Sequence, residues 1–176
     1  MRGKYLCLVL AIAVLFSGAY AKTKKGKKPG RLSVSANVSV FDPPGDVSSA
    51  LLFEVSAKYR ISQKFTGELS AGWSQYDDNG TNTTYVPVQT NLEFHPLGRG
   101  MFDPYVGGGL SANFTQANDQ TTATAGVQAL GGLSFKPADK VSFSVEIKYN
   151  LPDITDPKSG GFSLGGGADL NWSTEM

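Results

Sequence analysis

Residues 141–149 read VSFSVEIKY, with an apolar side chain at every odd position and a polar one at every even position. Successive side chains of a β-strand point to opposite faces, so this period of two predicts a strand with one apolar and one polar face. The alternation returns roughly every 15 to 20 residues, separated by turn residues. It predicts strands at about 31–41, 49–60, 64–76, 84–95, 103–115, 123–136, 140–150 and 160–172.

The first residues have the pattern of a secretory signal peptide. A positively charged start precedes an uncharged apolar run from Tyr5 to Phe16, and small residues follow at Ala19 and Ala21. This run is shorter than the about 20 apolar residues that a membrane-spanning helix needs. We therefore predict a signal peptide over 1–21, cleaved after Ala21, in preference to a retained anchor helix. The only cysteine, Cys7, leaves with it, so the mature chain has no disulfide and no thiol ligand.

The charges are unevenly distributed along the chain. There are 16 Lys and Arg residues against 15 Asp and Glu, but six of the basic residues lie between 22 and 31, which leaves an acidic remainder. We predict that 22–31 form a basic, flexible N-terminal arm, because its glycines and proline favour no regular structure. Contact of the arm with anionic lipid head groups is the alternative. Nucleic acid is not an expected partner of an exported chain, and residues 32–176 have the length of one domain.

The two faces of the predicted strands favour a membrane protein over a soluble one. The polar face of the first strand carries Ser33, Ser35, Asn37 and Ser39, all small and neutral, and its apolar face carries no charge. Charged residues make up 18% of the chain, below the quarter or so that is typical of soluble domains. A soluble β-sandwich or lipocalin-like barrel, which would act as a secreted binding protein, is the alternative.

Aromatic residues gather near the ends of the apolar faces, where the two membrane interfaces favour them. An open sheet edge in hydrocarbon would leave backbone groups unpaired, so the sheet must close. The sequence therefore predicts an all-β protein, a closed eight-stranded antiparallel up-and-down transmembrane β-barrel. The residues predicted to form the aromatic girdles are Tyr59, Phe65, Trp73, Phe94, Phe114, Phe135, Phe143, Tyr149, Phe162 and Trp172.

Three segments resemble the small outer-membrane β-barrel family of OmpA/OmpX-type, porin-like domains. They are DPYVGGGL at 103–110, GGLSFKP at 131–137 and GADLNW at 167–172. The resemblance implies a Gram-negative outer membrane, contact with lipid and lipopolysaccharide, a monomer, and delivery by periplasmic chaperones to the barrel-assembly machinery. It also implies that Gly167, Leu170 and Trp172 belong to the terminal-strand signal read by that machinery. Family members often end on an aromatic residue, whereas Ser173 to Met176 follow Trp172 here.

The candidate functional residues are the charged residues in the polar phase of the strands, which are expected to face the lumen. They are Glu54, Lys58, Arg60, Glu68, Glu93, Glu146, Lys148 and Asp169. A barrel of eight strands is about wide enough for its own side chains to fill. We therefore favour a plug of paired charges, which leaves a structural or surface-interaction role, over a narrow channel for small solutes or ions.

The sequence offers no catalytic or metal site and no cofactor motif. The single histidine, His95, is expected to be a surface residue at the inner rim, and no nearby serine pairs with it. The segments 77–83, 116–122 and 151–159 are predicted to be the longer outer loops, whereas 61–63 and 137–139 are predicted to be tight turns. The outer loops are rich in aspartate, for which turn chemistry is the first explanation and a divalent cation the alternative.

Overall fold

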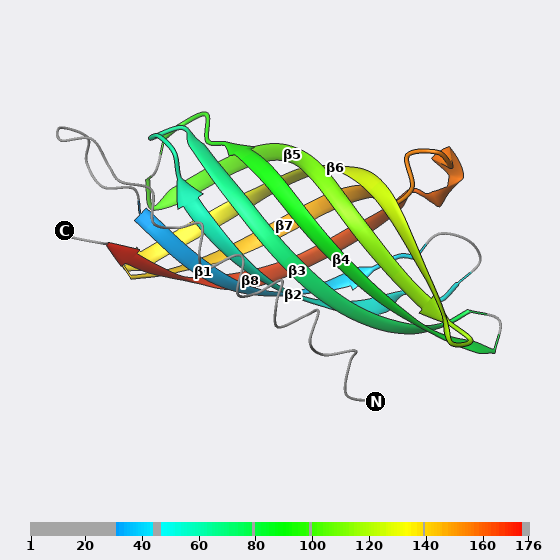
Figure 1. The fold of residues 1–176 in the computed structure, drawn as a ribbon. Helices are drawn as coiled ribbons and strands as arrows, with labels where there is room; N and C mark the ends of the chain where they lie inside the picture. Colours follow the sequence, from blue (N-terminus) through cyan, green and yellow to red (C-terminus); the bar gives the residue numbers. More distant parts are fainter. Residues whose placement is uncertain (1–30, 44–46, 79, 99, 139, 174–176) are drawn as a thin grey trace. The chain divides into compact units, whose positions relative to one another are not determined.

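A computed structural model of the chain describes residues 31–43, 47–78, 80–98, 100–138 and 140–173. Within this part, every strand pairs antiparallel with its neighbours in sequence and β1 pairs with β8 (Figure 1). The predicted closed eight-stranded, up-and-down barrel is therefore confirmed. The strands are β1 (Arg31–Phe41), β2 (Ala50–Arg60), β3 (Phe65–Asp78), β4 (Thr81–Phe94), β5 (Phe102–Ala117), β6 (Gln120–Ala138), β7 (Val141–Leu151) and β8 (Gly161–Ser173).

The predictions for the N-terminus lie outside the described residues, since both the signal peptide and residues 22–30 of the arm precede β1. In the described part, no helix has the length and hydrophobicity that crossing a membrane requires. A single 3₁₀ turn, η1 (Pro157–Ser159), interrupts the loop between β7 and β8.

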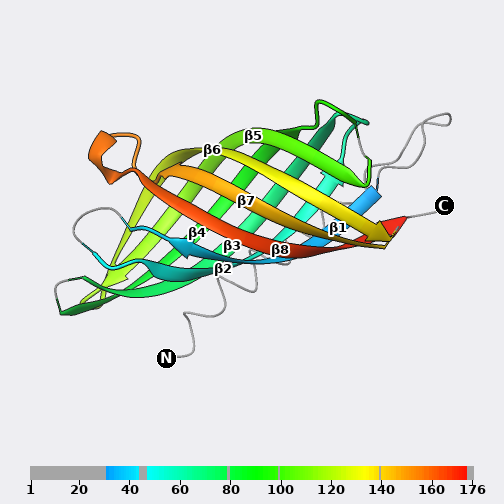
Figure 2. The same ribbon diagram turned by 180° about the vertical axis from the view of Figure 1, so that it is seen from behind.

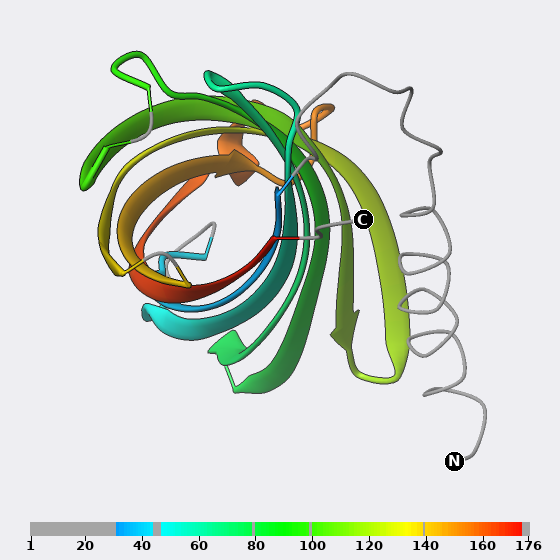
Figure 3. The same ribbon diagram turned by 90° about the vertical axis from the view of Figure 1, so that its left-hand side faces the viewer.

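The period of two places the apolar side chains on the outside of the barrel. Val145 and Ile147 are 62% and 53% exposed, whereas Ser144 and Lys148, which flank this pair, are buried. Figure 3 looks along the barrel and shows the strands enclosing one interior. Small residues allow the strands to approach closely. A Cβ atom at Gly107, for example, would lie 2.7 Å from the carbonyl oxygen of Leu92.

The two ends of the barrel differ. We call the end where β1 begins and β8 finishes the inner end, and the opposite end, with the loops 42–49 and 152–160, the outer end. Figure 1 shows the β3–β4 and β5–β6 hairpins reaching out at the outer end, and Figure 2 shows the same end from behind. Short turns at one side and longer excursions at the other are typical of outer-membrane barrels, whose longer side is extracellular.

The prediction of longer loops at 77–83 and 116–122 is wrong. Both segments are mostly strand, and two-residue turns join β3 to β4 and β5 to β6. Asn118 and Asp119 have φ angles of 46° and 63°, the left-handed pair that a tight type I′ hairpin turn requires. Hydrogen bonding across the hairpin also continues through the side chains, since Gln75 donates to Asn82 at 2.6 Å. The polar residues of these segments have the composition of turns, but most of them are exposed residues at strand ends.

Candidate functional site in the barrel interior

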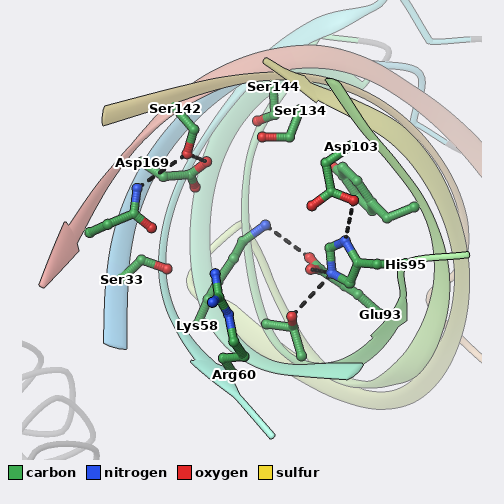
Figure 4. Close-up of a pocket in the computed structure, with 13 residues that line it drawn as sticks. Ser33, Lys58, Arg60, Glu93, His95, Asp103, Ser134, Ser142, Ser144 and Asp169 are labelled. Atoms are coloured by element: carbon green, nitrogen blue, oxygen red, sulfur yellow. Dashed lines mark hydrogen bonds and ion pairs between the residues drawn. The ribbon is translucent and has the colours of Figure 1, made fainter. Parts of the chain in front are cut away.

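A polar pocket opens at the inner end of the barrel interior, and we call it the inner pocket (Figure 4). Its volume of about 50 Å³ has room for a few water molecules. Lys58 and Arg60 of β2 line one side, and His95 and Asp103 flank the β4–β5 connection on another. Serine side chains and Asp169 complete the wall. The pocket therefore brings together charged groups of both signs from strands far apart in the sequence.

Lys58 holds the carboxylates of two neighbouring strands together above the inner pocket. Its Nζ atom lies 2.9 Å from Glu93 Oε1 and 3.7 Å from Glu68 Oε1. Glu68 also accepts a hydrogen bond from Asn91 at 3.0 Å. The same ammonium group lies 5.5 Å from the ring centroid of Tyr105, within cation–π range. Burying these charges is tolerable because each one is paired.

His95 is a buried member of this network, and the prediction that it is a surface residue is wrong. It is only 4% exposed, because it points into the barrel from the end of β4. Its Nδ1 atom lies 3.0 Å from Asp103 Oδ1, and its Nε2 atom lies 3.1 Å from Thr66 Oγ1 and 3.4 Å from Glu93 Oε2. Proline follows His95 in the sequence, which suggests a turn at the surface. In the structure the turn begins after His95, and the imidazole itself points into the barrel.

Asp169 forms the opposite side of the inner pocket. It accepts hydrogen bonds from the hydroxyl groups of Ser35 and Ser142, the second at 3.1 Å. Asn171 in turn donates to Ser142 at 3.4 Å. This carboxylate is thus held by hydroxyl groups from β1 and β7, the strands on either side of its own strand β8.

A second ionic layer crosses the interior nearer the middle. Lys148 Nζ lies 3.2 Å from Glu54 Oε1 and 3.5 Å from Glu146 Oε1, and it donates to Gln89 Oε1 at 3.1 Å. Tyr105 donates to the other oxygen of Glu146 at 3.0 Å, which ties this layer to the ring over Lys58. The layer therefore connects β2, β4, β5 and β7 across the barrel.

An apolar layer, formed by side chains of β1, β2 and β4, lies in the interior toward the outer end, and no sequence prediction included it. Phe41 stacks on Tyr85 with ring centroids 5.2 Å apart, and Leu52 is 1% exposed beside them. Tyr85 donates its hydroxyl hydrogen to Asn113 at 2.8 Å. A Cβ atom at Gly72 would lie 3.0 Å from a methyl group of Leu52, so the side chains fill the space opposite this glycine. The one available signal was the phase of Phe41, Leu52 and Tyr85, which all fall on the polar side of their strands.

All eight residues predicted for the lumen charge network have side chains in the inward phase of their strands. Seven of them take part in the contacts described above, and Arg60 lines the inner pocket. Most of the predicted girdle residues lie on the outer face with exposed rings; Phe94 and Phe135 are partly covered, and the side chain of Trp172 lies outside the described residues. Gly167 and Leu170 lie in β8 and pair with both β1 and β7.

The elements of a nucleophile, base and acid do meet in the inner pocket, although no serine is involved. Thr66, His95 and Asp103 follow one another at hydrogen-bond distances of 3.1 and 3.0 Å. However, Glu93 lies against the same imidazole nitrogen as Thr66, and the threonine side chain is 3% exposed. Among the described residues, no group of three or more His, Cys, Asp and Glu side chains has an arrangement that could hold a metal ion.

Comparison with known families and structures gives consistent results. The family model described as outer membrane protein beta-barrel domain matches residues 7–169. A search of curated proteins gives no match. Among solved structures, Neisserial surface protein A (NspA) is similar with a TM-score of 0.68 and 15% identity, covering 81% of this chain and 97% of that chain. The N-terminal β-barrel domain of Pseudomonas aeruginosa OprF has a TM-score of 0.60 and 16% identity, covering 82% and 100%.

The outer membrane enzyme PagL is also similar, with a TM-score of 0.51 and 16% identity, covering 78% of this chain and 98% of that chain. At these identities the likeness to solved structures shows a shared fold. The same fold therefore occurs in an enzyme as well as in barrels that are not named as enzymes, and the chemistry of the interior has to be judged from the residues themselves.

Proposed function

Because this chain belongs to the outer membrane protein β-barrel domain family, we propose that it is a non-conducting barrel of the outer membrane that acts at the cell surface. The family membership rules out the secreted soluble alternative. The observation that carries the proposal is the succession of three side-chain layers across the interior: the Lys58 layer, the Lys148 layer and the apolar layer of Phe41, Leu52 and Tyr85. An eight-stranded barrel has little space beyond its own side chains, so these layers leave no continuous water column.

The outer end supports the surface role. Strands β3 to β6 have 14 to 19 residues, more than the about 9 to 11 that a tilted strand needs to cross the bilayer. Their hairpins therefore extend beyond the hydrocarbon as a four-stranded sheet. A rigid, filled barrel is a suitable base for presenting such a sheet to partners outside the cell.

A narrow channel for small solutes or ions is the second candidate, favoured by the polar inner pocket and by the smaller cavity beyond it, which is lined by Glu54 and Glu146 among others. We place it second because both cavities are small and the stacked rings of Phe41 and Tyr85 fill part of the interior toward the outer end. Lipopolysaccharide around the barrel, delivery by chaperones to the barrel-assembly machinery, and a monomeric state complete the proposal.

We further propose that the protein is not an enzyme. Hydrolysis would need a threonine that a substrate can approach, and Thr66 is buried beneath a pocket that holds only a few water molecules. Glu93 beside His95 also competes for the nitrogen that would take the threonine proton. A fluorophosphonate probe tests this directly. We expect no labelling, whereas labelling that Thr66→Val abolishes would establish a nucleophile.

Conductance of the purified protein in planar bilayers tests the occlusion. We expect no steps for the wild type and small, cation-dependent steps for Phe41→Ala/Leu52→Ala/Tyr85→Ala, which removes the apolar layer. Phe53→Ala is the matched control, since this ring is 47% exposed on the outer face and its loss leaves the interior unchanged. Steps of similar size in the wild type and in the triple variant would reject the occluded barrel and favour the channel.

Adhesion of bacteria that display the protein tests the surface role. We expect cells with the wild-type barrel to adhere to animal-cell monolayers more than cells whose β3–β4 and β5–β6 hairpins are shortened to the length of β7. The shortened barrel should still show heat-modifiable migration in detergent. Equal adhesion of both strains would contradict the surface role without affecting the conductance result.

A further inference from the structure

Strand β6 has a free edge at the outer end. It begins at Gln120, but its pairing with β7 begins only at Val127, opposite Leu151. Residues 120–126 therefore have a neighbouring strand on the β5 side alone, as the projecting hairpin in Figure 1 shows. Figure 2 shows the same hairpin from behind, projecting past the end of the shorter β7.

The direction of the backbone groups at this edge can be inferred from a single hydrogen bond. Ile154 donates its N–H to the carbonyl oxygen of Ala125 at 3.0 Å, so the backbone C=O of Ala125 points away from β5. The backbone groups of successive residues alternate in direction along an antiparallel strand. The N–H and C=O groups of Ala123 and Thr121 therefore also point away from β5. Within the described residues, no backbone hydrogen bond reaches that side of either residue, and both are exposed. Their N–H and C=O groups are thus available to an added strand.

The edge lacks the features that normally prevent strand addition. Exposed edges usually carry charge, proline or a bulge. The segment from Gln120 to Thr124 is uncharged and contains no proline, and it pairs with β5 without a register shift. At the other side of the projecting sheet, β3 continues past its last partner in β2, and that free end carries Asp77 and Asp78. Only the β6 edge therefore presents a neutral, unobstructed ladder.

The charges around the edge determine what it would accept. Asp119 lies at the turn where β6 starts, and Asp153 and Asp156 lie in the loop that contacts β6 through Ile154 and Pro152. Lys158 is the one cationic side chain among residues 152–160. A basic strand would be attracted to these carboxylates, whereas an acidic strand or a polyanion would be repelled.

We propose that the free edge of β6 binds an extended, basic segment of a partner protein, which adds to the sheet as a further strand beside Thr121 and Ala123. This inference rests on the proposed surface role and specifies the site and the chemistry of the partner. Main-chain hydrogen bonds would supply affinity, and the surrounding aspartates would supply the preference for lysine and arginine.

The test measures binding of a labelled peptide to the full barrel in lipid nanodiscs by fluorescence anisotropy. The probe is a peptide of about ten residues that alternates lysine with valine or threonine, and the control peptide has glutamate in place of lysine. We expect binding of the lysine peptide alone, weakened by salt. Ala123→Pro should weaken it about tenfold, because proline removes an edge donor and its ring obstructs the approaching strand.

Matched variants separate the edge from the fold. The N–H of Ala123 points away from β5, so proline there removes no bond of the native ladder, and heat-modifiable migration should remain. Thr121→Lys keeps the backbone and repels the basic peptide, so it should weaken binding even if Ala123→Pro fails to fold. Thr122→Ala changes a side chain whose backbone faces β5 and should leave binding within about twofold.

Replacing Asp119, Asp153 and Asp156 by Asn keeps the turn geometry and removes the charges. We expect about fivefold weaker binding and a smaller salt dependence. Equal binding of the lysine and glutamate peptides, or no effect of both Thr121→Lys and Ala123→Pro, would overturn the inference. So would the absence of any binding to the wild type. The conductance and adhesion measurements are independent of this probe, so a silent barrel that adheres but binds no peptide would refute the edge and leave the proposed function standing.

Discussion

Replacing Lys148 by Met removes the cation at the centre of the second ionic layer. The side chain is 6% exposed, and its ammonium group contacts Glu54 at 3.2 Å and Glu146 at 3.5 Å. Methionine has a similar length and fills most of the same space, so the change tests the charge rather than the packing. It leaves two carboxylates facing each other in the interior, together with a Gln89 oxygen that has lost its donor.

The size of the effect follows from these distances. At 3.2 Å, two opposite charges attract with about 5 kcal/mol at an effective dielectric constant of about 20. Desolvation offsets much of this attraction while the pair is intact, but removing one partner leaves the cost of burying the other, typically about 3–5 kcal/mol. We expect Lys148→Met to lower the free energy of unfolding by about 3 kcal/mol, at the low end of this range. With an m-value of about 1–3 kcal/mol per M, the urea midpoint falls by roughly 1 to 3 M.

The assay is urea unfolding in lipid vesicles, followed by tryptophan fluorescence and by heat-modifiable migration. A double-mutant cycle with Glu54→Gln isolates the pair, and we expect the double variant to be more stable than the sum of the single changes by about 2 kcal/mol. Lys140→Met is the control, because this exposed lysine lies at the inner-end turn and its loss should cost less than about 0.5 kcal/mol. A loss at Lys148 no larger than that at Lys140 would refute the view that paired charges hold the interior together.

Three further predictions concern other parts of the barrel. His95→Gln should cost about 1–3 kcal/mol in urea unfolding because it removes the imidazole partner of the buried Asp103 carboxylate, whereas a cost equal to that of Thr66→Val would mean that only one hydrogen bond matters. Gly167→Ala should prevent assembly, since its Cβ would overlap the amide of Asn37 and lie 2.8 Å from a backbone oxygen; Gly131→Ala, with its nearest neighbour 3.9 Å away, should assemble normally. Hydrogen bonds from the hydroxyl and amide of Thr155 hold the pKa of Asp153 below its usual range, so the order of this loop should be present at neutral pH and decline only as the pH falls through that lowered pKa. Amide exchange at Thr155 measures this, and a decline already complete near pH 5 would contradict it.

The alternation in the sequence was sufficient to predict the fold. In β2 and β7 each residue lies on the face that its parity predicts, because a shift by one residue would turn the apolar side chains of a strand such as Val145 and Ile147 into the interior. The strand ends beyond the bilayer were not predictable in this way. There both faces of a strand meet water, so segments such as 77–83 lose the alternation and have the composition of loops. Their pairing depends on the partner strand and not on local composition.

The contents of the interior could be predicted only in part. Parity alone places Lys148 and Glu54 inside, but it does not show that residues 94 positions apart in the sequence meet. His95 shows the limit most clearly. Its partners Thr66 and Asp103 come from adjacent strands at separations of 29 and 8 residues, set by the register of β3 with β4 and of β4 with β5. The sequence offers no means of finding that register before the barrel is closed.

In the proposed occluded barrel, the ionic and apolar layers would resist flow for different physical reasons, which bears on function. The ammonium group of Lys148 lies within 4 Å of the carboxylates of both Glu54 and Glu146, so a small movement can exchange its partner. The stacked pair of Phe41 and Tyr85 has no such exchange, and opening it would expose apolar surface at an unfavourable free energy. In the proposed occluded barrel, rearrangement of the charges alone would therefore not open a path to the outer end. The surfaces left to interact with the outside would then be the loops and the projecting sheet, including the edge of β6 that we propose accepts a strand.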